Sequence, residues 1–169
     1  MQGDPDGQIS LGFMYNYGYG VPKNFVQAFK WFKKAADRGY PKAQSNVGLM
    51  YEAGDGVQQD YAKAAQWYQK AARQGLADAQ NYLGTLYETG QGVRRDYAVV
   101  AQWYRRAVEQ NNGSAQFRMG GMFETGRGVK KDFKRAISLY ESAAAQDIEE
   151  AQVALNRLNQ TSSPLPPPN

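Results

Sequence analysis

The chain has 169 residues, of which 42% are apolar and 21% are charged, and its formal net charge is +4. It contains neither cysteine nor histidine. These absences exclude disulfide bonds, thiolate zinc sites, cysteine nucleophiles and histidine as a general base. No apolar run approaches the length of a transmembrane helix. The first residues lack the features of a signal peptide, so we expect a cytoplasmic protein, or a periplasmic one if a leader was removed before Met1.

The dominant feature of the sequence is a pattern that returns every 36 residues. A period of this size is typical of stacked arrays of small helical or strand units. Three sets of residues are in register in four successive units: Gly12, Gly48, Gly84 and Gly120; Tyr15, Tyr51, Tyr87 and Phe123; and Gly18, Gly54, Gly90 and Gly126. Since a solenoid offers a long surface, the pattern favours a function in binding a partner.

Each unit is expected to form two helices. In the third unit Ala79, Leu83 and Leu86 recur at helical spacing, Gly90 ends the first helix, and Asp96 is a good N-cap for the second. The spacing predicts an all-α, α/α solenoid of four 36-residue hairpins and a capping helix, within a single domain over residues 1–160. The expected helices are 5–17, 24–38, 41–53, 60–74, 77–89, 96–110, 113–125, 132–146 and the cap 149–160. We expect residues 161–169, which are rich in proline, to form a disordered tail.

Glycine in the middle of a helix costs about 0.5–1 kcal/mol relative to alanine. The register of Gly12, Gly48, Gly84 and Gly120 therefore predicts that another backbone passes close to each of them. Small residues of the second helix would be the counterparts. These are Ala35, Ala71, Ala107 and Ala143.

The repeated pattern resembles the Sel-1-like repeat over about residues 5–160. In the third unit it consists of Ala79, Leu83, Gly84, Leu86, Tyr87, Gly90, Gly92, Val93, Asp96, Tyr97, Trp103, Tyr104 and Ala107. The resemblance implies a right-handed α-superhelix similar to tetratricopeptide arrays, and a non-enzymatic scaffold for protein–protein interaction. Bacterial proteins of this type serve as regulators and as immunity proteins that neutralise a toxin. Leu139 departs from the pattern, because the other units have tryptophan at this position.

The resemblance implies that the first helix of each unit lines a concave face, where residues outside the fixed pattern would contact a protein or peptide. Glu52, Glu88 and Glu124 repeat on this face. They are either a ladder of acids for a basic segment, with apolar sockets around it, or exposed helix formers paired with basic neighbours. The predicted contact residues are Ile9, Phe13, Asn16, Ser45, Leu49, Glu52, Asn81, Thr85, Glu88, Phe117 and Glu124.

Two further surfaces are expected outside the groove. Tyr17 and Tyr19 stand near the N-terminal end, where they would contact a partner or form a weak dimer of an otherwise monomeric protein. A basic edge of loop residues favours an alternative function in binding RNA or another nucleic acid, although the glutamates of the groove oppose it. The basic loop residues are Lys23, Arg94, Arg95, Lys130 and Lys131.

The sequence gives no indication of an enzyme. The Gly-x-Gly of each loop lacks the lysine and serine or threonine of a phosphate-binding loop, and it follows a helix rather than a strand. No calcium-loop pattern is present, and no carboxylate pair in an apolar setting is expected. We therefore expect no cofactor, no metal and no small-molecule substrate.

Overall fold

The computed structural model describes residues 3–162, and these residues form nine helices and no strand. Four antiparallel hairpins are followed by a ninth helix, which packs on the helix before it. The helices are α1 (Pro5–Tyr17), α2 (Phe25–Asp37), α3 (Pro41–Ala53), α4 (Tyr61–Arg73), α5 (Ala77–Thr89), α6 (Tyr97–Glu109), α7 (Gly113–Thr125), α8 (Phe133–Ala144) and α9 (Glu149–Ser162). The prediction of an all-α solenoid is confirmed. The predicted tail over 161–169 lies almost wholly outside the described residues.

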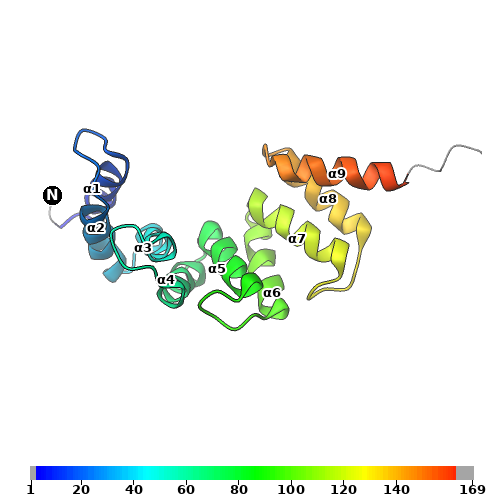
Figure 1. Cartoon of the computed structure of the whole chain (residues 1–169), viewed down its shortest axis with the longest axis horizontal. Helices are drawn as coiled ribbons and strands as arrows, with labels where there is room; N and C mark the ends of the chain where they lie inside the picture. The colour runs from blue at the N-terminus through cyan, green and yellow to red at the C-terminus, as the bar shows by residue number, and fades with distance from the viewer. Residues whose placement is uncertain (1–2, 163–169) are drawn as a thin grey trace, which may run out of the picture.

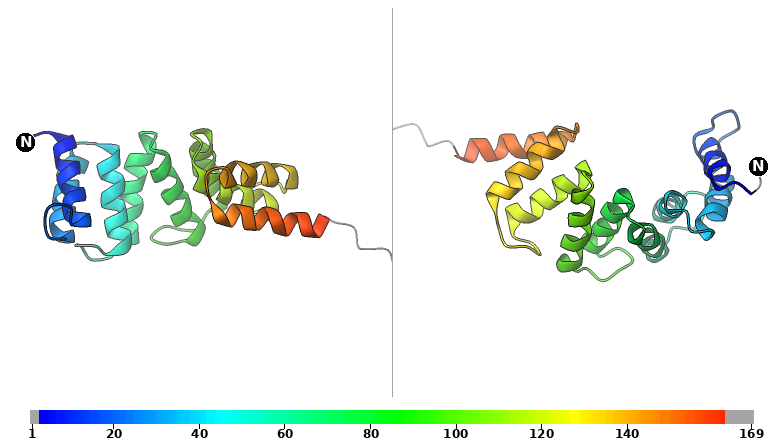
Figure 2. Two further views of the ribbon diagram at one scale, coloured as in Figure 1. Left: turned by 90° about the horizontal axis from the view of Figure 1, so that it is seen from above. Right: turned by 180° about the vertical axis from the view of Figure 1, so that it is seen from behind.

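The hairpins form an open arch (Figure 1). Its inner side carries α3, α5 and α7, and its outer side carries α4 and α6. Figure 2 shows the same row of hairpins from above and from behind. The extensive helix contacts are those between consecutive helices, so each repeat is stabilised chiefly by its immediate neighbours.

Capping side chains set the start of the second helix in each hairpin. The Asp60 carboxylate accepts a hydrogen bond of 2.9 Å from the Lys63 backbone N–H, and Asn24, Asp96 and Asp132 act in the same way. These residues are therefore caps, and the helices begin one residue later than predicted. The turns after α6 and α8 place Asn111 and Asp147 at φ of 60° and 61°, as expected for counterparts of glycine.

The glycines in the middle of the inner helices face aromatic rings. A Cβ on Gly48 would lie 2.6 Å from the ring of Tyr68, and one on Gly120 would lie 2.7 Å from the ring of Tyr140. Gly84 and Gly12 are covered in the same way by Tyr104 and Phe32. The predicted alanine counterparts are wrong, because the nearest atoms come from these four rings of the second helices. A backbone atom, the Ala136 carbonyl oxygen at 3.3 Å, is among the three nearest only at Gly120.

The second glycine of the interhelical loop has a role between repeats. A Cβ on Gly56 would collide with the backbone at Phe25, which begins the second helix of the preceding repeat. Gly92 and Gly128 meet Tyr61 and Tyr97 in the same way. The glycine therefore permits the loop to pack directly on its neighbour, and this packing accounts for the Gly-x-Gly pattern without any ligand.

A hydrogen-bonded pair of glutamines closes the other end of the second, third and fourth hairpins, and the sequence reasoning missed it. One glutamine of each pair is buried on the first helix, and its partner at the end of the second helix is exposed. Gln44 and Gln80 are 5% and 3% exposed. Their side-chain oxygens accept hydrogen bonds of 2.8 and 2.9 Å from Gln74 and Gln110. Gln116 and Gln146 form the third pair, at 2.8 Å. The regular spacing of these glutamines in the sequence was the available signal.

Candidate partner-binding site

The glutamates of the inner face are hydrogen-bonded to buried tyrosines of their own repeat. The hydroxyl of Tyr68 donates to Glu52 at 2.6 Å, and the hydroxyl of Tyr104 donates to Glu88 at 2.7 Å. Tyr140 and Glu124 form the third pair at 2.7 Å. These are the tyrosines that cover the glycines, so each carboxylate fixes a ring on which the hairpin closes.

The first repeat shows why these glutamates recur. It has Phe32 where the others have tyrosine and Asn16 where the others have glutamate. Without a hydroxyl to bond, this repeat has no carboxylate. The glutamate repetition therefore follows the tyrosine repetition and has a structural cause. Neither the interpretation as an acid ladder nor the interpretation as exposed helix formers paired with basic neighbours included this cause.

Burial raises the pKa of all three tyrosine hydroxyls, and the adjoining glutamate raises each pKa further. For Tyr104 the hydrogen bond with Thr85 lowers the pKa in part, as the charge of Arg118 also does. The hydroxyls therefore stay protonated at neutral pH and donate to the carboxylates. A carboxylate that accepts such a bond keeps its remaining oxygen positions for a cation or a partner.

Arginines of the following repeat neutralise two of the three glutamates. A guanidinium nitrogen of Arg118 lies 3.6 Å from Glu88, and one of Arg157 lies 2.7 Å from Glu124. Among the described residues, Glu52 has no such ion pair. The acidic character of the inner face is therefore concentrated near the second repeat.

A hollow of about 270 Å³ opens on the inner face among α1, α3 and α5. Phe13 and Leu49, both predicted contact residues, lie on it, and Leu49 is 37% exposed. Ser45 also lines it but is only 6% exposed. The full lining consists of Phe13, Lys42, Ser45, Asn46, Leu49, Leu76, Asp78 and Tyr82. The lining thus combines apolar side chains with one cation and one anion.

The other predicted contact residues are not gathered in this hollow. Ile9 and Phe117 are half-buried against the cores of the first and fourth repeats. Asn81 is 6% exposed, and its side-chain oxygen has no hydrogen-bond partner. Thr85 donates its hydroxyl to the Asn81 carbonyl at 3.1 Å. These four side chains lie along the solenoid axis rather than at one spot.

Tyr17 and Tyr19 are 58% and 67% exposed, and they lie at the end of α1 and in the loop after it. The ring of Tyr17 stacks on Phe13 at 6.1 Å and on Tyr19 at 5.5 Å. Because Phe13 lines the hollow, the predicted groove and the predicted end contact are joined in one aromatic surface. The sequence reasoning treated them as separate.

Cations of the loops lie over the rings that begin the second helices. Lys23 lies 4.5 Å from the ring centre of Phe25, and Lys131 lies 4.6 Å from that of Phe133. Arg95 takes the same place on its neighbour Tyr97, at 5.8 Å. These contacts give three of the five predicted basic residues a local packing role.

Within the described part of the chain, no group of acidic residues is arranged to hold a metal ion. No helix in residues 3–162 is both long and apolar enough to cross a membrane.

Comparisons with known proteins agree with this architecture. The family model described as the Sel1 repeat matches residues 5–40, 41–76, 77–112 and 113–148. A Sel1 repeat protein from Oxalobacter formigenes has 41% identity and a TM-score of 0.83, over 91% of this chain and 63% of that one. A protective antigen of uropathogenic Escherichia coli strains has 36% identity and a TM-score of 0.87, over 98% of this chain.

This chain spans only 36% of the length of the Escherichia coli antigen. Cysteine-rich protein B of Helicobacter pylori is 28% identical, with a TM-score of 0.60, over 75% of this chain and 96% of its own. A search of curated proteins found no match. The four family-model matches cover most of the residues described above, and on that evidence the chain belongs to the Sel1 repeat proteins.

Proposed function

We propose that this protein is a non-enzymatic interaction module that binds a segment of another protein on its inner face. Sel1 repeats are typical of interaction scaffolds, which supports the class of function. The observation that carries the location is the hollow among α1, α3 and α5, where Leu49 and Phe13 are available to solvent. Apolar side chains at the bottom of a depression are the usual anchoring sites for a partner.

The chemistry of the hollow favours a segment with one large apolar side chain and a nearby basic residue. The apolar side chain would enter between Phe13 and Leu49. The basic residue would approach Glu52, which has no ion pair within residues 3–162. Glu52 acts on the edge of the hollow, because burial, Asp78 and Glu52 together raise the pKa of Tyr82 there. Tyr17 and Tyr19 would extend the contact toward the N-terminal end.

Random peptides displayed on phage and selected on the whole protein provide the test. We expect Leu49→Asp to weaken the selected peptides at least about tenfold, as loss of a central anchor does. Val26→Asp is the matched control, because Val26 is 49% exposed on the second helix of its hairpin. Equal affinity for both variants would place binding elsewhere and refute the proposal.

The more specific roles, as a bacterial regulator or as an immunity protein that neutralises a toxin, both require a groove of this kind. The same peptides define the binding motif of the natural partner. A motif that matches a regulatory protein supports the first role, and one that matches a secreted toxin supports the second.

Nucleic-acid binding by the loop edge is the alternative. Single-stranded RNA would then bind with a steep salt dependence, because phosphate contacts release counterions. Arg94→Glu together with Lys130→Glu would abolish that binding, while Leu49→Asp would leave it intact.

A further inference from the structure

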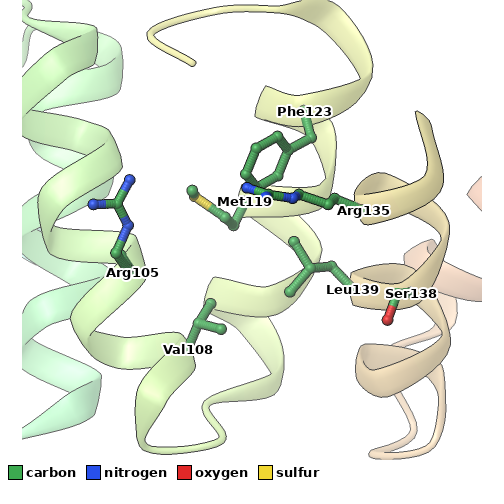
Figure 3. Close-up of a pocket in the computed structure, with 7 residues that line it drawn as sticks. All are labelled: Arg105, Val108, Met119, Phe123, Arg135, Ser138 and Leu139. Carbon is green, nitrogen blue, oxygen red and sulfur yellow. The ribbon is translucent and has the colours of Figure 1, made fainter. Parts of the chain in front are cut away.

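A pocket on the outer side of the arch lies between the last two hairpins, and we call it the α6–α8 pocket. Its volume is about 340 Å³. Three helices form it, and its lining consists of Arg105, Val108, Met119, Phe123, Arg135, Ser138 and Leu139. Figure 3 shows Arg105 and Arg135 reaching toward the opening from opposite sides, with Met119 between them.

The position of Leu139 explains why the pocket exists. The other three repeats have tryptophan here, at Trp31, Trp67 and Trp103. Trp67 is 9% exposed and belongs to the core cluster of the first two repeats, so its indole fills the boundary between them. Trp103 packs on the core of the second repeat in the same way. Leucine is shorter, and the fourth repeat leaves this space open.

A hollow at the preceding boundary overlaps the equivalent place in part. It is lined by Gln69, Leu83 and Tyr87, among others, which are the counterparts of Arg105, Met119 and Phe123. Its volume is about 170 Å³, half that of the α6–α8 pocket. At that boundary Trp103 occupies the position of Leu139, and it packs on the core without lining the hollow.

The chain itself shows what such a space holds. Lys33 of α2 lies 5.2 Å from the ring centre of Trp67, as a cation over an aromatic face. Arg105 is the counterpart of Lys33 two repeats later, and it has the same relation to Leu139. An aromatic ring in the α6–α8 pocket would therefore lie beneath the Arg105 guanidinium.

The charge of the pocket adds a second requirement. Neither Arg105 nor Arg135 faces a carboxylate within the lining. Arg135 has an exposed ion pair with Asp132 at 3.3 Å and lies 5.5 Å from the Phe123 ring centre. Among the described residues, Arg105 has no ion pair. A ligand with a carboxylate next to its ring would complement this charge, and guanidinium binds carboxylate well.

We propose that the α6–α8 pocket accepts an aromatic side chain of a protein partner, with an adjoining carboxylate bound by Arg105. This is a second binding surface, on the opposite side of the arch from the hollow of Leu49. The carboxylate belongs either to the C-terminus of the partner or to a neighbouring acidic side chain.

The test follows isotope-labelled methionine methyl groups by NMR in the full chain, because Met119 forms part of the lining and is 3% exposed. The first probe is N-acetyl-tryptophan, and its uncharged amide is the comparison. We expect a saturable shift of Met119, no shift of Met14 or Met50, and about three- to fivefold tighter binding of the acid, as one exposed ion pair provides.

The N-acetylated amide of tryptophanyl-aspartate distinguishes the two sources of the carboxylate. Tighter binding of this dipeptide than of N-acetyl-tryptophan assigns a side-chain carboxylate, and the reverse order assigns a C-terminus. Either order supports the pocket, provided that both charged probes bind more tightly than the amide.

Two variants make the test specific. Leu139→Trp restores the residue of the other repeats and should abolish the Met119 shift. Arg105→Gln copies the second repeat, alters an exposed side chain, and should make the acid and the amide bind equally. A shift that survives Leu139→Trp, or a lack of any saturable shift in the original protein, overturns the proposal. A Met119 shift that follows protein concentration instead of probe also overturns it, since the occupant is then a second copy of the chain.

Discussion

The two halves of the inner face use the same repeat to make different surfaces. Toward the N-terminal end, Leu49 is exposed beside Phe13, and Glu52 has no cation. Toward the C-terminal end, the Phe117 ring packs 5.7 Å from Tyr140, and Arg157 covers Glu124. The first half is open to a partner, whereas the second half is largely closed by its own side chains.

One position in the repeat accounts for the contrast between Glu52 and Glu88. Asn46, Tyr82 and Arg118 are equivalent residues on successive inner helices. Tyr82 packs 5.2 Å from Tyr68 and provides no cation for Glu52, whereas Arg118 forms an ion pair with Glu88. Repeated residues therefore build the frame, whereas variable residues such as Arg118 and Arg157 determine which glutamates are neutralised.

The largest expected effect is a difference in stability between alanine variants of two adjacent glycines in the closed half. Gly120→Ala places a methyl group against the Tyr140 ring and should lower the free energy of unfolding by about 1–3 kcal/mol. Gly121→Ala is the control, since its Cβ would lie 3.6 Å from the nearest atom, and helix propensity should raise stability by up to about 1 kcal/mol. Urea denaturation measures both, and equal midpoints would contradict the ring packing.

The next effect concerns the Tyr–Glu pair that both halves share. Tyr68→Phe and Glu52→Ala each leave a polar group without its partner, and each should cost about 1–3 kcal/mol. The double variant Tyr68→Phe with Glu52→Asn copies Phe32 and Asn16 of the first repeat. We expect the double variant to lose at least about 1 kcal/mol less free energy of unfolding than Tyr68→Phe and Glu52→Asn lose in sum when each is made alone. Strict additivity would show that the pair is not coupled.

The dependence of stability on alkaline pH provides a second test of the pair of Tyr68 and Glu52. Burial and the adjoining glutamate hold the pKa of Tyr68 above its ordinary value of 10.0. In the unfolded chain the pKa of this hydroxyl is about 10, and below that pH the shift contributes its full stabilisation to the folded state. The stabilisation is lost as the pH rises from about 10 through the higher pKa of the folded state. We expect urea midpoints to fall more steeply above pH 10 in the original protein than in Tyr68→Phe. Tyr17→Phe, which alters an exposed ring, serves as the control, and identical slopes in all three would refute the linkage.

The smallest expected effect concerns the ion pair that neutralises Glu124 in the closed half. Arg157→Ala removes the ion pair with Glu124, whose partners are 57% and 13% exposed, and should cost about 0.2–1 kcal/mol at low salt. High salt should reduce this cost. Arg127→Ala, in an exposed loop, is the matched control. Urea denaturation at two salt concentrations measures the difference, and a cost that does not change with salt would exclude the ionic contribution.

Much of the fold follows from local features of the sequence. The helix bounds were predicted to within two residues, because caps such as Asp60 and terminal glycines such as Gly54 act within one turn. The partner of Gly84 was not predictable in the same way. An alanine and a tyrosine of the second helix both recur with the period, and only the orientation of that helix places Tyr104 on the glycine.

The groove was predictable as a face but not residue by residue. Helical spacing places Ser45 and Asn81 on the inner side, yet both are only 6% exposed, because the next repeat covers that edge of the helix. The burial of these side chains depends on the tilt between repeats, and a short stretch of sequence does not determine that tilt. The aromatic continuity from Phe13 to Tyr19 was missed for the same reason.

The paired glutamines have a consequence for how such arrays change in evolution. Gln44 bonds to Gln74, and Tyr68 bonds to Glu52, all within residues 41–76. A duplication or deletion of this whole unit therefore keeps both partners of these two hydrogen bonds together. Recombination between copies can lengthen or shorten the protein in steps of 36 residues. The length of the binding surface can therefore change in evolution independently of the residues that line it.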